Sequence, residues 1–316
     1  MASPTTLRAA LAVIAVAVLT VGCATPVGGS ASRDPDANLD ILNLALLDPG
    51  GYPTTPRAPF GDADTMRVGR HLEALRLAEV IAIPFEIDST FTGTKSPALA
   101  LTDPFGLDMQ FMVPIGKALA RHDFLAGYVT SATQKRAASN YLVSALLRFP
   151  TDKDAAAAAT DLGAQTERYA DSAAGSSRPI LVPLSTPEYP DTTAVINEPP
   201  DSFSMSTLYA YTAHGPFVLA QQISIGTPEK AVALMGRAIE VQTDMLAGFE
   251  PTAVDDLVDL PIDPDGLLAR TLPAGSPESL RFAIVSCSSF PHGFFNAYGR
   301  IAERAGQTGN EVKITV

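Results

Sequence analysis

Two segments of the chain share one local pattern, in which an apolar, strand-like run leads through a short turn into a helix. The first run spans residues 140–149 and the second spans residues 217–225. A threonine follows each run where a helix N-cap is expected, Thr151 in the first segment and Thr227 in the second. Pro228 suits the first turn of the second helix, because the N–H that it lacks has no helical partner there. The pattern therefore predicts a strand followed by a long helix in both places.

A further strand-like segment precedes each of these runs, and a partial third copy of the pattern lies near the C-terminus. The preceding segments are residues 124–130 and 206–213, and the third copy begins with residues 280–288. His214-Gly215 is expected to form the two-residue turn of the second hairpin, because glycine readily adopts positive φ. The predicted fold class is α+β, with antiparallel sheets from repeated strand-strand-helix units and the helices packed on one face.

The predicted domain organisation follows from this repeat and from the distribution of proline. Residues 171–204 contain six prolines and are predicted to be a Pro-rich linker or a long loop. A first α+β unit with an N-terminal extension is predicted at residues 40–170, and it includes an early helix capped by Asp64 or Thr65. A second unit, together with the partial third copy, is predicted at residues 205–316.

Composition and charge exclude several classes of partner. The chain has 316 residues, of which 46% are hydrophobic and 18% charged, as is typical of a globular protein with a sizeable core. Its formal net charge is −12, and lysine and arginine do not cluster along the sequence. Nucleic acid binding requires a basic surface, so no nucleic acid partner is expected. The same acidity disfavours electrostatic adhesion to anionic lipid, so association with a membrane needs another cause.

The N-terminal segment has the organisation of a signal peptide. Arg8 supplies a positive charge, and residues 9–21 form a stretch that is apolar except for Thr20. As a helix this stretch would span roughly 20 Å, which is shorter than the roughly 30 Å hydrocarbon core of a bilayer. Residues 1–22 are therefore predicted to be a lipoprotein signal peptide, and the rest of the protein is expected to be exported.

Cys23 is the predicted point of lipid attachment. The run LTVGC that ends at this cysteine resembles the bacterial lipobox, with Leu19 one position earlier than usual. Residues 23–39 are predicted to be a flexible tether, because they begin with a stretch rich in Gly, Ser, Ala and Pro. Acyl chains such as palmitate would give stable anchoring, at about 0.8 kcal/mol per buried methylene. We therefore expect a lipid-anchored protein on the extracytoplasmic face of the cell membrane.

The second cysteine, Cys287, leaves two alternatives open. An exported protein could pair it with Cys23 in a disulfide, or Cys23 could be left unmodified. With a lipid on Cys23, Cys287 is a lone thiol. It alternates with Ala283 and Val285 onto one face of a strand-like segment, so its expected role is that of a small buried core residue.

The sequence contains none of the familiar catalytic or metal-binding motifs. It has no Gly-rich phosphate loop, no His-Glu-x-x-His, no Gly-x-Ser-x-Gly and no Cys-x-x-Cys. A pairing of His292 with Cys287 would lack an orienting third group. Aspartates between Asp255 and Asp265 do not follow the EF-hand spacing and are expected to cap helices and turns. No catalytic residue, metal site or cofactor is predicted, and the four histidines are widely separated: His71, His122, His214 and His292.

Four runs carry a resemblance to a known family. They are GYPTTPR at residues 51–57, GRHLEALRLAE at 69–79, AHGPFVL at 213–219 and LPIDPDGLLARTLP at 260–273. Together with the lipobox-like N-terminus, they resemble a family of uncharacterised actinobacterial lipoproteins built on a domain of unknown function. The resemblance implies a cell-envelope lipoprotein, and it supplies no catalytic residues.

These observations predict a class of function without naming a ligand. We expect an exported, lipid-anchored cell-envelope protein that binds a ligand or partner without catalysis, the partner being a lipid, a small molecule or an envelope protein. An apolar cavity between helices and sheet would favour a lipid or small-molecule carrier, whereas a filled core would favour a protein-interaction role. The alternative is an envelope hydrolase with a nonstandard active site, which would need a histidine, a carboxylate and a serine or cysteine in one cluster.

Overall fold

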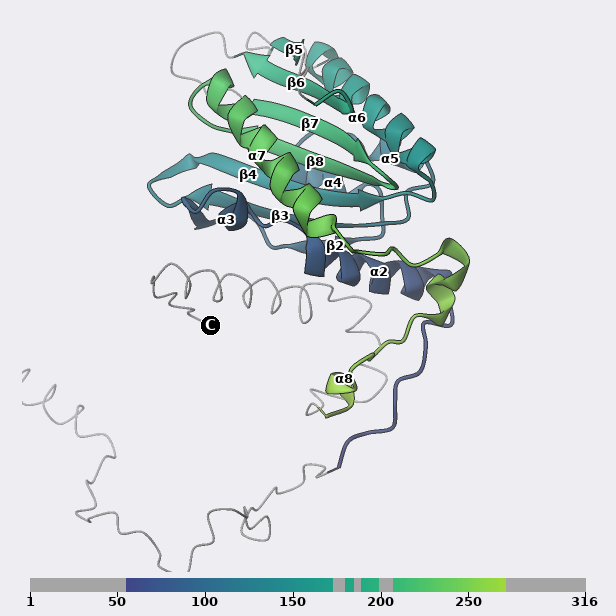
Figure 1. Cartoon of the computed structure of the whole chain (residues 1–316). Coiled ribbons are helices and arrows are strands. Elements are labelled where there is room, and N and C mark those ends of the chain that lie inside the picture. The colour runs from purple at the N-terminus through teal and green to yellow at the C-terminus, as the bar shows by residue number, and fades with distance from the viewer. Residues whose placement is uncertain (1–54, 173–179, 185–188, 199–206, 271–316) are drawn as a thin grey trace, which may run out of the picture. The chain divides into compact units, whose positions relative to one another are not determined.

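The computed structural model describes residues 55–172, 180–184, 189–198 and 207–270 (Figure 1). The predicted signal peptide, the tether and Cys23 lie outside these residues. So do Cys287, His292 and the partial third copy of the repeat.

Eight strands form one antiparallel sheet in the order β1-β3-β4-β8-β7-β6-β5, with β2 paired to β3 on the same side as β1. β3 and β4 form a hairpin, β7 and β8 form another, and these two hairpins meet where β4 pairs with β8. The strands are β1 (Phe91–Thr94), β2 (Leu99–Leu101), β3 (Ala126–Gln134), β4 (Ala137–Arg148), β5 (Ile180–Leu184), β6 (Thr192–Glu198), β7 (Thr207–His214) and β8 (Phe217–Ser224).

The predicted helix starts are confirmed. In each of three helices the threonine before the first turn accepts a hydrogen bond from the backbone N–H three residues later, at 3.1–3.5 Å: Thr65, Thr151 and Thr227. The helices are α2 (Met66–Val80), α3 (Pro84–Ile87), α4 (Gly106–Phe111), α5 (Gly116–Ala120), α6 (Asp152–Ser172), α7 (Pro228–Leu246) and α8 (Leu267–Arg270), with a 3-10 helix, η2, at Val254–Asp259.

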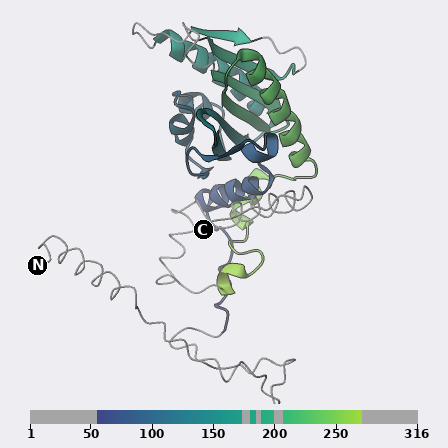
Figure 2. The same cartoon turned by 90° about the vertical axis from the view of Figure 1, so that its left-hand side faces the viewer.

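Helices cover both faces of the sheet (Figures 1 and 2), where the sequence predicted only one covered face. We call the side packed against α2, α3 and α7 the α7 face, and the side packed against α4, α5 and α6 the α6 face. The cause is visible in β4, whose Leu142 and Leu146 face α7 while Val143 and Leu147 face α6. A strand that is apolar on both sides needs cover on both sides. The α+β class and the antiparallel sheet are confirmed.

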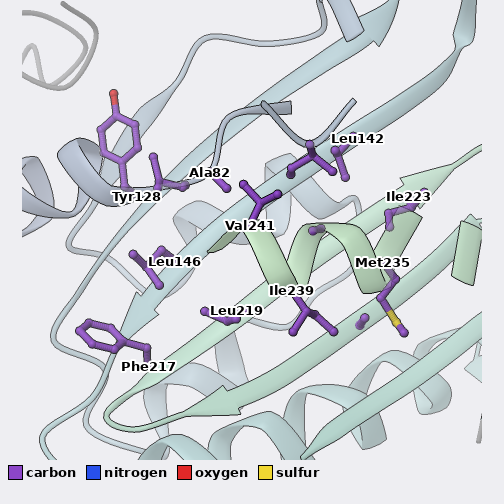
Figure 3. Close-up of a cluster of buried hydrophobic side chains, with 14 of the residues drawn as sticks. Ala82, Tyr128, Leu142, Leu146, Phe217, Leu219, Ile223, Met235, Ile239 and Val241 are labelled. Atoms are coloured by element: carbon purple, nitrogen blue, oxygen red, sulfur yellow. The ribbon is translucent and has the colours of Figure 1, made fainter. Parts of the chain in front are cut away.

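The core of the α7 face is formed by side chains of α7 that meet those of the central strands. Figure 3 shows Met235, Ile239 and Val241 of the helix among strand residues that include Leu219 and Ile223. Met235 and Ile239 are four residues apart on α7, about one helical turn, and Leu219 and Ile223 are an even number of residues apart on β8, so each pair lies on one face of its element.

The strand-strand-helix repeat is present in the order of the elements along the chain, but its two copies are arranged differently in space. The two strand-strand-helix units are present as β3-β4-α6 and β7-β8-α7, as predicted. Their helices, however, lie on opposite faces of the sheet. The turn of the second hairpin is Gly215-Pro216, one residue later than predicted, with φ of +54° at Gly215.

The Pro-rich segment 171–204 differs from the predicted linker or loop, because its described residues include β5 and β6. These two strands extend the sheet beyond β7, so they join the two predicted units rather than separating them. β5 lies at the edge of the sheet, where Pro183 is tolerated because an edge position can leave the missing N–H unused.

The carboxylate of Glu73 ties α2 to the rest of this scaffold. It is fully buried and accepts hydrogen bonds from Arg148 at 2.6 Å and from Arg76 at 2.7 Å. Thr252, in the segment after α7, donates its hydroxyl at 2.8 Å and its backbone N–H at 3.2 Å. The two carboxylate oxygens of Glu73 thus accept four hydrogen bonds from the protein itself. Because no acceptor site is left for a ligand, the role of this network is structural.

Candidate functional site

A polar cluster interrupts the apolar α6 face at one end of the sheet. We define it by five residues of β4, β7 and β8: Tyr141, Thr207, Tyr209, Gln222 and Ser224. Strand register places Tyr141 opposite Ser224 and Ser224 opposite Thr207, with Tyr209 opposite Gln222 in the next row. Because side chains alternate along a strand, all five project to the same face.

Gln222 lies at the centre of the polar cluster. Its side chain is 1% exposed, and its Nε2 donates to the phenol oxygens of Tyr141 at 3.1 Å and Tyr209 at 3.3 Å. The other end of the amide, Oε1, has no hydrogen-bond partner among the residues that the structure describes. Rotating the amide by 180° would exchange the positions of Oε1 and Nε2, and one of the two atoms would still lack a partner. A buried polar atom left unpaired costs about 1–3 kcal/mol, so this atom is suited to a ligand or a water molecule.

The two tyrosines of the polar cluster are hydrogen-bonding groups rather than bases. Burial raises the pKa of Tyr209, and the neighbouring Tyr141 phenol raises it further. Burial also raises the pKa of Tyr141, although the hydroxyls of Thr207 and Ser224 partly offset this effect. Both phenols therefore remain protonated around neutral pH and keep an O–H to donate.

Lys95 adds a positive charge at the edge of the polar cluster. Its Nζ lies 4.7 Å from the ring centroid of Tyr141 and donates to the carbonyl oxygen of Gln110 at 3.4 Å. Within the part of the chain that the structure describes, no carboxylate forms an ion pair with it. Burial lowers the pKa of this lysine, because partial removal of water disfavours the charged form.

Hydrogen bonds of the next residue hold Lys95 in place. The Ser96 hydroxyl lies 2.6 Å from Oε1 of Gln110 on α4 and 2.8 Å from the Ser131 hydroxyl on β3. The Ser96 backbone N–H also donates to that Ser131 oxygen at 3.2 Å. The loop between β1 and β2 is thereby fixed to both the helix and the sheet, and the position of Lys95 is fixed with it.

None of the residues singled out in the sequence belongs to the polar cluster. His71 is buried on α2, and His214 ends β7. His122 bonds Asp161 at 2.8 Å, and this bond, with a contribution from Arg121, lowers the pKa of that partly exposed carboxyl group. The signal that could have led to the polar cluster is the pair Gln221-Gln222, two amides within an otherwise apolar strand.

The acidic run contributes a helix cap, as predicted. Asp263 accepts hydrogen bonds from the backbone N–H groups of Leu268 at 3.0 Å and Ala269 at 2.9 Å. Asp255 and Asp256 lie in the first turn of η2. Across residues 55–270, within the ranges that are described, no three histidine, cysteine or acidic side chains gather as a metal site would require.

None of the helices in the described ranges is both long enough and apolar enough to span a bilayer.

Comparison with known proteins gives a family and a distant structural likeness. A family model described as the N-terminal part of a domain of unknown function, DUF7373, matches residues 60–262. No curated protein sequence matches the chain. Among solved structures, the extracellular domain of PknH from Mycobacterium tuberculosis is similar with a TM-score of 0.39 and 13% sequence identity. That match covers 54% of this chain and 95% of the PknH chain.

Proposed function

The chain belongs to the DUF7373 family, whose function is unknown, and we propose from its own residues that it binds a small polar ligand without transforming it. The proposed binding site is the polar cluster. The proposed location is the extracytoplasmic face of the cell membrane, with the chain anchored through acyl chains on Cys23. The short apolar N-terminal stretch and the lipobox-like run support this location.

One observation carries the proposed binding role, namely the buried amide of Gln222 in its setting of hydroxyl groups. One end of that amide is held by two tyrosines, and the other end has no partner among the described residues. A ligand hydroxyl or N–H at Oε1 would remove the penalty for this unpaired oxygen. The surrounding hydroxyls of Tyr141, Tyr209 and Ser224 can donate to or accept from the same ligand.

Binding is favoured over hydrolysis by the groups that surround the polar cluster. The hydrogen bonds found for its five residues join hydroxyls and one amide, with no histidine or carboxylate among the described partners. A hydroxyl nucleophile needs an adjacent base to remove its proton. The pair that could act as base and orienter, His122 and Asp161, bonds Arg121 instead of a serine or cysteine within the described residues.

The experiment compares two glutamine variants of the native protein. The full chain is purified from its own membrane, and small molecules that co-purify are identified by mass spectrometry for wild type, Gln222→Leu and Gln221→Leu. Gln221 is the matched control, since it is 2% exposed and adjacent on β8 but faces α7. We expect a compound that co-purifies with wild type and Gln221→Leu and is lost from Gln222→Leu. Equal recovery from both variants would refute the proposed site.

The proposed anchor is tested separately. Replacement of Cys23 by serine is expected to abolish metabolic labelling with a fatty acid, because the thiol is the only proposed acceptor. Retained labelling would contradict the assignment of Cys23.

A further inference from the structure

Resting on the function proposed above, we propose that Lys95 and the polar cluster form one site for a phosphate-bearing ligand. The phosphate would lie on the Lys95 ammonium and a ligand hydroxyl on Oε1 of Gln222. Three features support this site: the fixed position of the Lys95 charge, the absence of a counter-ion for it among the described residues, and the hydroxyl groups of the adjacent polar cluster.

The position of Lys95 is set by the fold and not by a flexible surface chain. Ser96 is bonded to both α4 and β3, so the backbone next to Lys95 cannot move without breaking these bonds. The aliphatic part of the lysine is half-buried, and its ammonium lies over the Tyr141 ring. The phenol oxygen of the same tyrosine is bonded to Gln222, which links the charge directly to the polar cluster.

The charge of Lys95 is not balanced by its described neighbours. Its hydrogen bond to the Gln110 carbonyl, at 3.4 Å, is longer than is usual for a charged donor. A cation–π contact returns about 0.5–2 kcal/mol, less than a well-placed anion returns to a partly desolvated ammonium. Two of the three N–H donors of Lys95 therefore remain for a ligand.

Two further cations lie at this end of the sheet. Lys135 and Arg136 form the exposed turn between β3 and β4, close along the strands to Tyr141. Neither forms an ion pair with another described residue. These two cations add to Lys95 at this end of the sheet, where Asp88 is the acidic residue linked to the turn, through Thr90 and Gln134.

Phosphate fits this group of donors better than carboxylate does. A carboxylate is best matched by the planar fork of arginine, whereas lysine acts on phosphate as a point charge. A phosphate also has enough oxygens to accept from the ammonium and from a hydroxyl at the same time. Two exposed methionines, Met109 on α4 and Met112 just after it, lie close to Gln110 in sequence. Exposed apolar side chains beside an anion site would suit a lipid. The phosphate therefore has two candidate sources, a phospholipid headgroup and a soluble ligand, which the experiment must distinguish.

The test uses glycerol 3-phosphate as the soluble probe and glycerol as its neutral match. The purified full chain is titrated with each at constant ionic strength by calorimetry, and the lysine Cε resonances are followed by NMR. We expect glycerol 3-phosphate to bind, glycerol not to bind, and the Lys95 resonance to shift. Lys95→Met should weaken binding by about tenfold or more, as expected for loss of one charge-assisted contact. Lys153→Met, which removes an exposed charge at the start of α6, is the matched control and should leave the affinity within about twofold.

A second arm identifies the source of the phosphate. The Cys23→Ser chain, which lacks the proposed anchor, is mixed with vesicles of phosphatidylglycerol or of phosphatidylcholine. Lys95-dependent binding to phosphatidylglycerol vesicles, tighter than to glycerol 3-phosphate, would assign the phosphate to a lipid headgroup. Lys95-dependent binding of the soluble probe alone would assign it to a free ligand.

Two results would overturn the inference: equal affinity of wild type and Lys95→Met for glycerol 3-phosphate, or no binding of the phosphate probes to wild type. These results are independent of the glutamine experiment. A neutral co-purifying compound that is lost from Gln222→Leu would leave the proposed function standing and refute the phosphate. The opposite outcome is phosphate binding that depends on Lys95 while Gln222→Leu binds phosphate as tightly as wild type. It would refute the proposed role of Gln222 and the joint site, leaving an anion site at Lys95 alone.

Discussion

Gln221 and Gln222 are neighbours on β8 that project to opposite faces of the sheet. Both are almost fully buried, and Oε1 of each lacks a partner among the residues that the structure describes. Gln221 lies on the α7 face, opposite Ser144 and Ala210 of the adjacent strands, within the apolar core beneath α7. Gln222 lies on the α6 face between two tyrosines, with Lys95 next to one of them.

The difference shows that an unpaired buried oxygen does not by itself define a binding site. On the α7 face it is enclosed by helix and sheet, in a core where the buried carboxylate of Glu73 and the amide of Gln242 are both hydrogen-bonded within the protein. On the α6 face it is accompanied by hydroxyls and by a cation that lacks a described counter-ion. The oxygen of Gln221 therefore belongs to the core, whereas that of Gln222 has the neighbours on which the proposed binding site rests.

The largest expected effect tests the structural role of the α7 face. Arg148→Ala should lower the free energy of unfolding by about 3–5 kcal/mol, because it leaves the Glu73 carboxylate buried without its closest partner. Arg121→Ala breaks the exposed pair with Asp161 and should cost less than about 1 kcal/mol. Urea denaturation measures both. Similar losses for the two variants would remove the distinction between the buried network and a surface ion pair.

A second pair of variants tests whether both faces are packed. Leu146 and Leu147 are adjacent on β4, fully buried, and belong to the α7 face and the α6 face respectively. Each replacement by alanine should lower the free energy of unfolding by about 2–5 kcal/mol, since each removes a core side chain and leaves a cavity. A loss at Leu146 with almost none at Leu147 would contradict helices on both faces.

The smallest expected effect concerns pH and the tyrosines of the polar cluster. Burial raises the pKa of Tyr209 above its ordinary value of 10.0, so the folded protein retains the proton at pH values where the unfolded chain loses it. The associated stabilisation is complete below about pH 10 and is lost as the pH rises through the folded-state pKa. Tyr209→Phe should therefore flatten the decrease of stability above about pH 10, measured by urea denaturation at several alkaline pH values. An unchanged slope would show that this phenol is not protected by the fold.

Local signals were enough to predict the hairpins and the long helices. Thr151 and Thr227 are helix caps because a short hydroxyl side chain bonds the free N–H groups of a first turn, which depends on neighbouring residues only. The short helices α4 and α5 were not predicted, since they depend on contacts such as the burial of Phe111 and Leu119 in a distant core. The same reason applies to β5, whose proline pointed to a loop until its edge position was known.

The polar cluster could not be predicted because its members come from β4 and from the β7–β8 hairpin, which are far apart in sequence. Tyr141 and Tyr209 fit an apolar strand pattern, and only the pairing of β4, β8 and β7 brings their hydroxyls to Gln222. Lys95 lies still earlier in the chain, in a loop whose position depends on Ser131. Sequence periodicity reports which face a side chain occupies, but not which side chains become its neighbours across the sheet.

The central pairing of β4 with β8 has a consequence for any attempt to divide the chain. Each of these strands supplies the hydrogen-bonding edge that the other needs, although they come from different sequence units. A fragment that ended after α6 would present the open edge of β4, and a fragment that began at β5 would present that of β8, each with apolar side chains on both sides. The two fragments should therefore reassociate when mixed or aggregate when alone, so the smallest part of the described chain expected to fold by itself contains the entire sheet.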